Sequence, residues 1–381
     1  MRKTKEGLVF TKHHLNSFDE ILEHIINSSN QVIDLDECQI NETFDLRVVL
    51  AELKKTPAFS DKISIKQDVN EFGYNVFYCI LGIPFRCETT IFTKGAYFEL
   101  VEFKDFVIFV GAVFESDYSF KKSIFHNSVN FSTVDFEAKE LPRQTIQFFR
   151  TIFKSDVSFF NAYFHSLVNF RLATFYDGVD FGEAEFSNID LSGVEMKNDA
   201  KLINYETATF QLVNNRITGL YLKQYALKMN DSVNVLKFKK MEMDAYRRYL
   251  ISKLSTSETS GIALVKNKID TLLDLAILYL NKWSNSHGNN FLKGVLFTLT
   301  MWFVFFSWFI ITRDGIGKTF IWTDGQYLKE AVNYLWIFNG IEEIMKDNTV
   351  SWGNIIPYFL GKILMTYGIY QTIAAFRKYN K

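Results

Sequence analysis

The chain has 381 residues, of which 48% are apolar and 39 are phenylalanine, and its formal net charge is −1 at pH 7. A chain of this length suits two or three structural units better than one small core. The near-neutral charge argues against a general nucleic-acid-binding protein, because such binding depends on clustered Lys and Arg that neutralise phosphates. The three cysteines, Cys38, Cys79 and Cys87, are too few for a disulfide framework and indicate a reducing compartment.

The N-terminal segment, residues 1–91, is predicted to be a cap region with a helix and short strands. No apolar run follows its basic start, MRKTK, so we expect no cleaved signal peptide and place the first 260 residues in the cytoplasm. Segments 61–66 and 75–81 are typical of strands. We expect them to lead into the first turn of the repeat structure that follows and to cover its open end.

A ladder of phenylalanines, spaced by alternating steps of six and five residues, dominates residues 92–200. A small or β-branched residue lies two positions before almost every rung, as Ala96 does before Phe98. Neither a helix nor an alternating strand has this period, but a solenoid of short strands joined by regular corners does. We expect the following rungs to stack in one shared core: Phe98, Phe103, Phe109, Phe114, Phe120, Phe125, Phe131, Phe136, Phe153, Phe159, Phe164, Phe170, Phe175, Phe181 and Phe186.

The ladder pauses between Phe136 and Phe153, where Pro142 and Gln147 occupy the expected rung positions. The interval of seventeen residues equals three ordinary steps. The spacing therefore predicts that the register of the solenoid continues through this stretch.

The run ATFYDGVDFGEAEFSNIDL, residues 173–191, resembles the pentapeptide-repeat family in its 11-residue, phenylalanine-rich variant. The resemblance implies a right-handed quadrilateral β-helix, here with four to five coils and a length of roughly 20 Å at about 4.8 Å per coil. Some members of that family mimic DNA, which needs a long acidic surface. Residues 92–200 carry 16 Asp and Glu against 10 Lys and Arg, so we interpret their outer surface as a solvated face and expect no nucleic-acid partner.

The next segment, residues 201–290, is predicted to be a helical connector. Residues 220–254 have helical apolar spacing and many charges, and 255–261 (STSETSG) are typical of a linker, either a hinge or an ordinary loop. The pattern of residues 270–283 (DTLLDLAILYLNKW) is amphipathic and predicts a helix that lies on a membrane surface.

The C-terminal segment, residues 291–381, is predicted to be a transmembrane domain with two helical spans, at about 293–312 and 355–376. Residues 294–312 carry no charge and are long enough to cross about 30 Å of hydrocarbon, whereas the second span is interrupted by Lys362. Basic residues flank the pair of spans, and acidic residues are more frequent between them. We therefore expect a multi-pass protein of the bacterial inner membrane with both termini in the cytoplasm. Residues 331–341 are too short to span and predict an outer-surface or re-entrant segment.

Lys362 and Gln371 are the candidate functional residues of the predicted membrane region. An ionisable residue inside a span is expensive, so it is a candidate for a functional role. Lys362 either extends its ammonium group towards the outer surface, or pairs with another group or lines a pore. Residues 280–299 and 367–379 also resemble the tail of membrane-attached pentapeptide-repeat proteins common in Bacteroidetes, whose function is poorly defined.

The sequence carries no recognisable catalytic or ligand motif. The run GIGKT at 315–319 is not a P-loop, because Thr312 stands where the first glycine is needed, and the six histidines lack metal-ligand spacing. We therefore expect no enzyme activity, no cofactor and no metal. The leading hypothesis is a cytoplasmic scaffold that binds an unidentified protein partner and is tethered to the lipid bilayer as a homo-oligomer. The alternative is an oligomeric ion channel or pore-forming effector of stress or antiphage defence.

Overall fold

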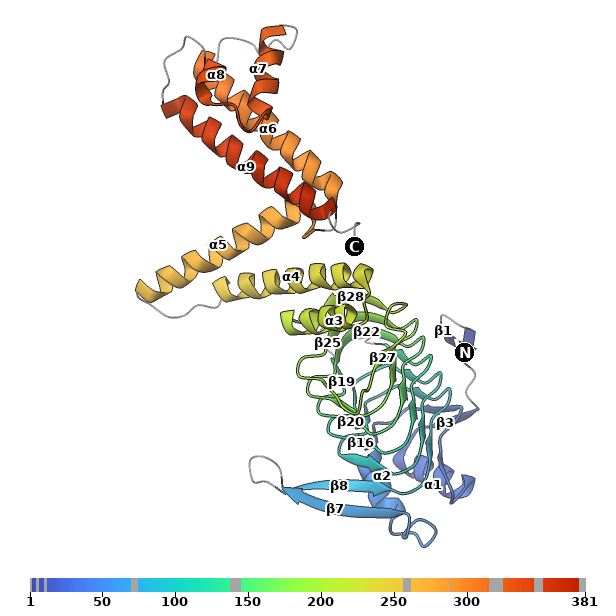
Figure 1. Ribbon diagram of the computed structural model, residues 1–381. Helices are drawn as coiled ribbons and strands as arrows, with labels where there is room; N and C mark the ends of the chain where they lie inside the picture. Colours follow the sequence, from blue (N-terminus) through green and yellow to red (C-terminus); the bar gives the residue numbers. More distant parts are fainter. Residues whose placement is uncertain are drawn as a thin grey trace. The chain divides into compact units, whose positions relative to one another are not determined.

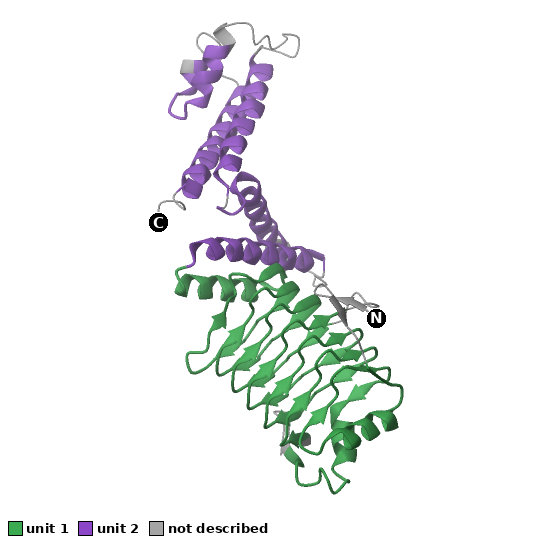
Figure 2. Ribbon diagram, turned by 90° about the vertical axis from the view of Figure 1, so that its right-hand side faces the viewer, with its two compact units in different colours: residues 1–230 green, residues 231–381 purple. Residues whose placement is uncertain are grey.

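The computed structural model describes residues 2–4, 7–9, 12–69, 75–137, 145–255, 262–288, 290–314, 325–345 and 352–376. The chain divides into two compact units, residues 1–230 and 231–381, which Figure 2 shows in different colours. The first unit contains a β-solenoid of about eight turns with parallel sheets, and a helical region follows it. The predicted β-solenoid is therefore confirmed.

Three sheets of stacked strands form the walls of the solenoid (Figure 1). The first sheet contains β3 (His13–Leu15), β5 (Cys38–Ile40), β6 (Phe44–Asp45), β10 (Ile91–Phe92), β11 (Ala96–Tyr97), β14 (Val113–Phe114), β15 (Tyr118–Ser119), β18 (Asp135–Phe136), β19 (Thr145–Gln147), β22 (Tyr163–Asn169), β25 (Glu185–Asp190) and β28 (Thr209–Val213). The second contains β7 (Ile63–Val69), β8 (Asn75–Leu81), β12 (Val101–Phe103), β16 (Ile124–Phe125), β20 (Ile152–Phe153), β23 (Thr174–Phe175) and β26 (Glu195–Met196). The third contains β4 (Ile33–Asp34), β9 (Phe85–Arg86), β13 (Val107–Ile108), β17 (Val129–Asn130), β21 (Val157–Ser158), β24 (Val179–Asp180) and β27 (Leu202–Ile203).

The strands pair in parallel from one turn to the next, so equivalent side chains lie directly above one another. Val107 pairs with Val129, 22 residues later, and Phe103 pairs with Phe125 at the same interval. The rings of Phe103 and Phe125 consequently stack with their centroids 4.8 Å apart and their planes 2° apart. All fifteen predicted rungs are at most 1% exposed, so the phenylalanines fill the interior of the solenoid.

Every second rung is followed by a tight corner in the left-handed backbone region. The residue two positions after such a rung has a positive φ, as at Leu100 (57°), Gly111 (66°), Lys122 (56°) and Thr133 (57°). Next to Gly111, the amide of Ala112 donates to the carbonyl of Phe109 at 2.9 Å, as in a β-turn of type II. Side chains other than glycine cost about 1 kcal/mol in this backbone region, and burial of the rungs offsets that cost.

The solenoid begins well before residue 92, the predicted boundary of the cap region. Strands β4, β5, β6, β8 and β9 already stack on the strands of the following turn. Phe44 and Phe85 extend the aromatic core, because their ring centroids lie 5.5 Å from Phe92 and 5.7 Å from Phe109. This early start, and strands β27 and β28 beyond residue 200, give about eight turns instead of the predicted four to five.

The predicted rung at Gln147 is wrong by one position. Phe148 is fully buried and stacks between Phe120 and Phe170, with centroids 4.9 Å from each. Ser119 pairs with Gln147, an interval of 28 residues, so this turn contains an insertion instead of three ordinary steps. The change of interval lies between β18 and β19, and the predicted rung position at Pro142 lies outside the described residues.

Helices lie at both ends of the solenoid and cover its open core. Helices α1 (Phe18–Ser28) and α2 (Leu46–Leu53) belong to the first turns, and α3 (Arg216–Lys228) follows the last strand. The hydroxyl of Ser17 caps α1 by accepting from the amide of Glu20 at 3.2 Å, and Asn215 caps α3 by accepting from the amide of Thr218 at 2.9 Å. Strands β7 and β8 form an antiparallel hairpin where two strands were predicted, and β1 (Arg2–Thr4) and β2 (Gly7–Val9) form another.

The second unit is helical. Its helices are α4 (Ser232–Ser255), α5 (Ile262–Asn285), α6 (Phe291–Asp314), α7 (Gly325–Leu335), α8 (Ile341–Met345) and α9 (Trp352–Phe376). Helices α6 and α9 lie side by side, and α7 and α8 pack against one end of this pair (Figures 1 and 2). An apolar cluster that includes Phe306, Phe309, Tyr334 and Met365 joins α6, α7 and α9.

Two membrane spans were predicted, but within the described ranges one helix is long and apolar enough to cross a membrane. This candidate is Phe291–Arg313 in α6, and 33% of its most apolar stretch is buried. The second predicted range does form α9. Helix α9 does not meet the same criterion of length and apolarity, and it contains the polar residues Asn354, Lys362 and Gln371.

Replacing one rung of the ladder tests the packing. We expect Phe159→Ala to lower the free energy of unfolding by about 3–5 kcal/mol, because Phe159 is fully buried and its removal leaves a cavity. Phe160→Ala is the matched control, because its ring is 40% exposed and we expect a change of about 1 kcal/mol or less. The measurement is urea unfolding of the full chain in detergent, monitored by far-UV circular dichroism. Equal losses for the two neighbours would contradict the ladder.

Candidate functional site

The buried face of α9 carries small and polar residues, including both candidate residues. Its buried members recur at steps of three and four residues, which places them on one side of the helix. They are Asn354, Pro357, Tyr358, Gly361, Lys362, Met365, Gly368, Gln371 and Ala375.

Two glycines on this face allow the helices to approach each other closely. A Cβ atom on Gly368 would meet the hydroxyl of Thr298 and lie 3.3 Å from its Cα. A Cβ on Gly361 would meet the hydroxyl of Tyr334 and lie 2.8 Å from the Cβ of Phe305. Small residues at such contacts are typical of helix pairs in membranes, where close packing replaces the hydrophobic effect.

Lys362 points into the protein and binds main-chain carbonyls at the end of α7. Its Nζ donates to the carbonyl oxygen of Tyr334 at 2.9 Å and to that of Trp336 at 2.5 Å, and the residue is 8% exposed. The same atom lies 5.4 Å from the ring centroids of Tyr334 and Tyr358. A helix ends in unpaired carbonyls with partial negative charge, so an ammonium group at this place stabilises the C-terminus of α7.

Two tyrosines reinforce the turn that follows α7. The hydroxyl of Tyr334 donates to the carbonyl of Pro357 at 2.8 Å, and the hydroxyl of Tyr358 donates to the carbonyl of Asn339 at 2.5 Å. Main-chain carbonyls outside helices need donors from other groups when they pack inside a protein. Lys362 and Tyr358 supply donors to the carbonyls of Trp336 and Asn339 in the segment 336–340, whereas the Tyr334 hydroxyl joins α7 to α9.

Helix α7 is held on α6 by two further contacts. The indole Nε1 of Trp302 donates to the carbonyl of Ala331 at 2.9 Å. Arg313 and Glu330 form an ion pair at 2.9 Å, with side chains that are 7% and 6% exposed. Removing one member of a buried pair leaves an uncompensated charge, so loss of Arg313 or Glu330 alone would destabilise the packing of α7 on α6.

Gln371 belongs to a second polar cluster, which joins α9 to the end of α5. Its Nε2 donates to the Oδ1 of Asn281 at 3.2 Å, and its Oε1 accepts from the Nδ2 of Asn285. The hydroxyl of Tyr367 donates to the same Oδ1 of Asn281 at 2.7 Å. The amides of these side chains satisfy one another in a buried place.

The structure places the two candidate residues on the same face but in separate clusters. Nine positions of α9 separate them, which is about 13 Å along a helix. Lys362 does not extend to the surface, which was one of its two interpretations, because its donors are directed to buried carbonyls. A pairing role fits these contacts. The contacts of both clusters are hydrogen bonds that join helices, so we interpret both clusters as structural.

The described residues contain no group of three or more His, Cys, Asp or Glu side chains that could hold a metal ion. The GIGKT run at 315–319 lies outside them. No protein-family model, curated protein or solved structure matches this chain. The resemblance to pentapeptide-repeat proteins therefore depends on the sequence alone, on the repeat and on the segments 280–299 and 367–379.

The role of Lys362 can be tested by keeping its length and removing its charge. We expect Lys362→Met to lower the stability of the helical unit by about 1–3 kcal/mol, because the carbonyls of Tyr334 and Trp336 lose their buried donor. The measurement is thermal unfolding in detergent, combined with hydrogen exchange of residues 332–339. Lys329→Met is the control, because Lys329 is exposed on α7. If both variants melt like the parent, the lysine bonds contribute nothing to the stability.

Proposed function

We propose that this chain is a multi-pass protein of a bacterial inner membrane, whose β-solenoid is a cytoplasmic scaffold that binds or senses a protein partner. In this proposal the solenoid is a right-handed quadrilateral β-helix of the pentapeptide-repeat family. Helices α6 and α9 cross the bilayer together as a hairpin. The proposal has a membrane part and a partner-binding part, and separate observations support them.

The exposed surface of α6 is the observation that carries the membrane part. Its outward side chains are large, apolar and 41–55% exposed: Leu292, Leu296, Leu299, Phe303, Val304, Trp308 and Ile311. A soluble protein rarely exposes a continuous apolar surface of this length. Hydrocarbon is the solvent that suits it.

Helix α9 supports a second crossing because its polar residues face inwards. Its outward face carries Ile356, Phe359, Leu360, Ile363, Tyr370, Ile373 and Phe376, which are 43–64% exposed. Lys362 and Gln371 lie on the opposite, buried face, where protein groups satisfy them. A helix that buries its polar groups against a neighbouring helix can cross a bilayer although those groups interrupt its apolar sequence.

The helices before α6 support a location of the N-terminal side in the cytoplasm. Exposed basic residues on α4 include Lys239, Lys240, Arg248 and Lys253, as expected for the positive side of a membrane protein. Helix α5 packs on α4 through Leu275 and Leu278 and exposes other apolar side chains. These are Ile269, Leu272, Leu273, Ile277 and Trp283, which would lie in the bilayer interface.

The solenoid supports partner binding through its outer surface. Its interior is filled by phenylalanine rings, so a partner would have to bind outside. Outward side chains repeat in columns, such as Ile108, Asn130, Ser158, Asp180 and Ile203 along the third sheet. Phe160 and Ile203 are 40% and 43% exposed. Exposed aromatic side chains are enriched in protein interfaces.

Cysteine labelling tests the hairpin. The three native cysteines are buried, so introduced ones dominate the reaction of the folded protein. We expect Glu342→Cys, on α8, to react with a membrane-impermeant maleimide in intact spheroplasts, because it would lie outside the inner membrane. Lys253→Cys, on α4, should react after lysis. If both positions need lysis, α6 and α9 do not cross the membrane as a pair.

Site-specific photo-crosslinking tests partner binding by the solenoid. With a photoreactive phenylalanine analogue at Phe160 we expect discrete heavier adducts in cells, because this ring lies outside the core. The same analogue at His165, an exposed position on strand β22, measures contacts of another sheet. Adducts of one size at one position would identify the binding face. Their absence at both positions, and at exposed positions of the second sheet, would contradict the scaffold.

A further inference from the structure

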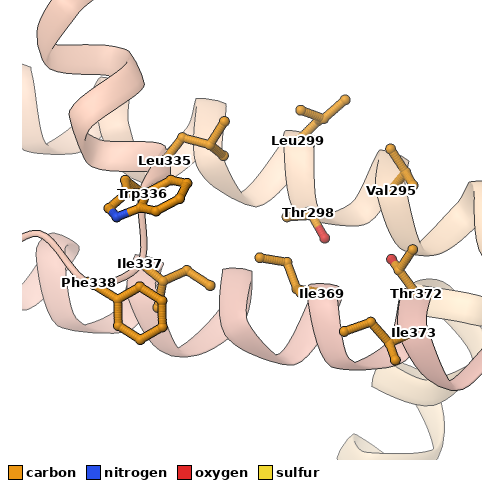
Figure 3. Close-up of a pocket in the computed structure, with 10 residues that line it drawn as sticks. All are labelled: Val295, Thr298, Leu299, Leu335, Trp336, Ile337, Phe338, Ile369, Thr372 and Ile373. Atoms are coloured by element: carbon orange, nitrogen blue, oxygen red, sulfur yellow. The ribbon is translucent and has the colours of Figure 1, made fainter.

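A groove opens on the side of the α6–α9 pair (Figure 3). Val295 and Leu299 on α6 form one wall, and Ile369 and Ile373 on α9 form the other. Trp336 and Phe338, in the turn after α7, close one end of it. The groove has a volume of about 430 Å³ and lies within the helical unit.

The lining of the groove suits hydrocarbon. Its two polar side chains, Thr298 and Thr372, point their hydroxyls back to their own helices and donate to the carbonyls of Gly294 at 2.8 Å and Gly368 at 2.9 Å. The only other polar side-chain atom of the lining is the indole nitrogen of Trp336. An occupant with several amide or charged groups would therefore leave most of them without a hydrogen-bond partner, which opposes its binding.

A thin apolar occupant suits a groove of this size. A single hydrocarbon chain can lie between the two helices, whereas an α-helix is about 10 Å across and could lay only one face along the groove. A helix of a second copy of this chain is the competing occupant, and in that case lipid would not concentrate at the groove.

The surroundings of the groove identify the source of that hydrocarbon. Phe338 is 87% exposed and Trp336 63%, and the outward faces of both helices beside the groove are apolar as well. The groove thus continues the surface that faces lipid in the proposed function. The molecules in contact with such a surface are the phospholipids of the bilayer.

We propose that this groove binds one acyl chain of a membrane phospholipid. The proposal rests on the membrane part of the proposed function. The bound chain fills the space between α6, α9 and the turn 336–338, and thereby supports the packing of that turn against the helix pair.

A photoreactive lipid tests the groove. The full chain is reconstituted into vesicles of phosphatidylethanolamine and phosphatidylglycerol that contain a phosphatidylglycerol with a diazirine near the end of one acyl chain. After irradiation, we expect lipid adducts to concentrate on peptides that contain residues 335–338 and 369–373. Leu299→Trp and Ile369→Trp, which fill the groove from opposite walls, should each reduce these adducts several-fold. Leu296→Trp is the matched control, because Leu296 is exposed on α6 but does not line the groove.

Two results would overturn the inference in distinguishable ways. If the parent does not float with the vesicles in a density gradient, the membrane part of the proposed function fails and the lipid site fails with it. If the parent floats but its adducts spread evenly over the exposed faces of α6 and α9, and neither groove-filling variant changes them, the lipid site alone fails.

Discussion

Stacking of aromatic rings along one axis is the constraint on which the first unit depends. Each turn must return the chain to the same place, after 22 residues in a regular turn and after 28 in the turn with the insertion, because a ring that misses its neighbour leaves a void and loses its contacts. The left-handed corners, at residues such as Leu100 and Lys122, follow from this requirement. The core therefore determines the backbone at some local cost, and variation is free to occur on the outer columns.

The second unit meets a different constraint, which is the satisfaction of main-chain polar groups away from water. Helices satisfy their own carbonyls except at their ends, and α7 ends inside the packed unit. The Lys362 ammonium group and the hydroxyl of Tyr358 provide the missing donors. A charge in an apolar helix ordinarily destabilises it, but here the ammonium group supplies hydrogen bonds to the end of α7 and to the turn that packs beside α9.

Much of the solenoid could be predicted because one residue type, phenylalanine, recurs with its period. The rungs from Phe98 to Phe186 are recognisable in the sequence by their regular spacing. The first turns use Ile33, Cys38 and Ile40 at equivalent inward positions, so no regular spacing of one residue type marks them. The insertion before Phe148 was hidden, since the interval from Phe136 to Phe153 happens to equal a sum of ordinary steps. Lys362 was visible as a charge in an apolar stretch. Its partners could not be predicted, because every residue has a main-chain carbonyl and the contact with Tyr334 spans 28 positions.

The contacts of the buried polar residues bear on whether the helical unit could form a pore. If Lys362 lined an aqueous pore, its ammonium group would have to leave the carbonyls of Tyr334 and Trp336, which would then lose their donor. The cost of exposing those carbonyls opposes the pore role and favours a fixed hairpin, in which each buried polar group is occupied by another. A fixed hairpin suits an anchor. The surfaces left to interact are then those that the constraints do not use: the outer columns of the solenoid, and the apolar faces and groove of the helices.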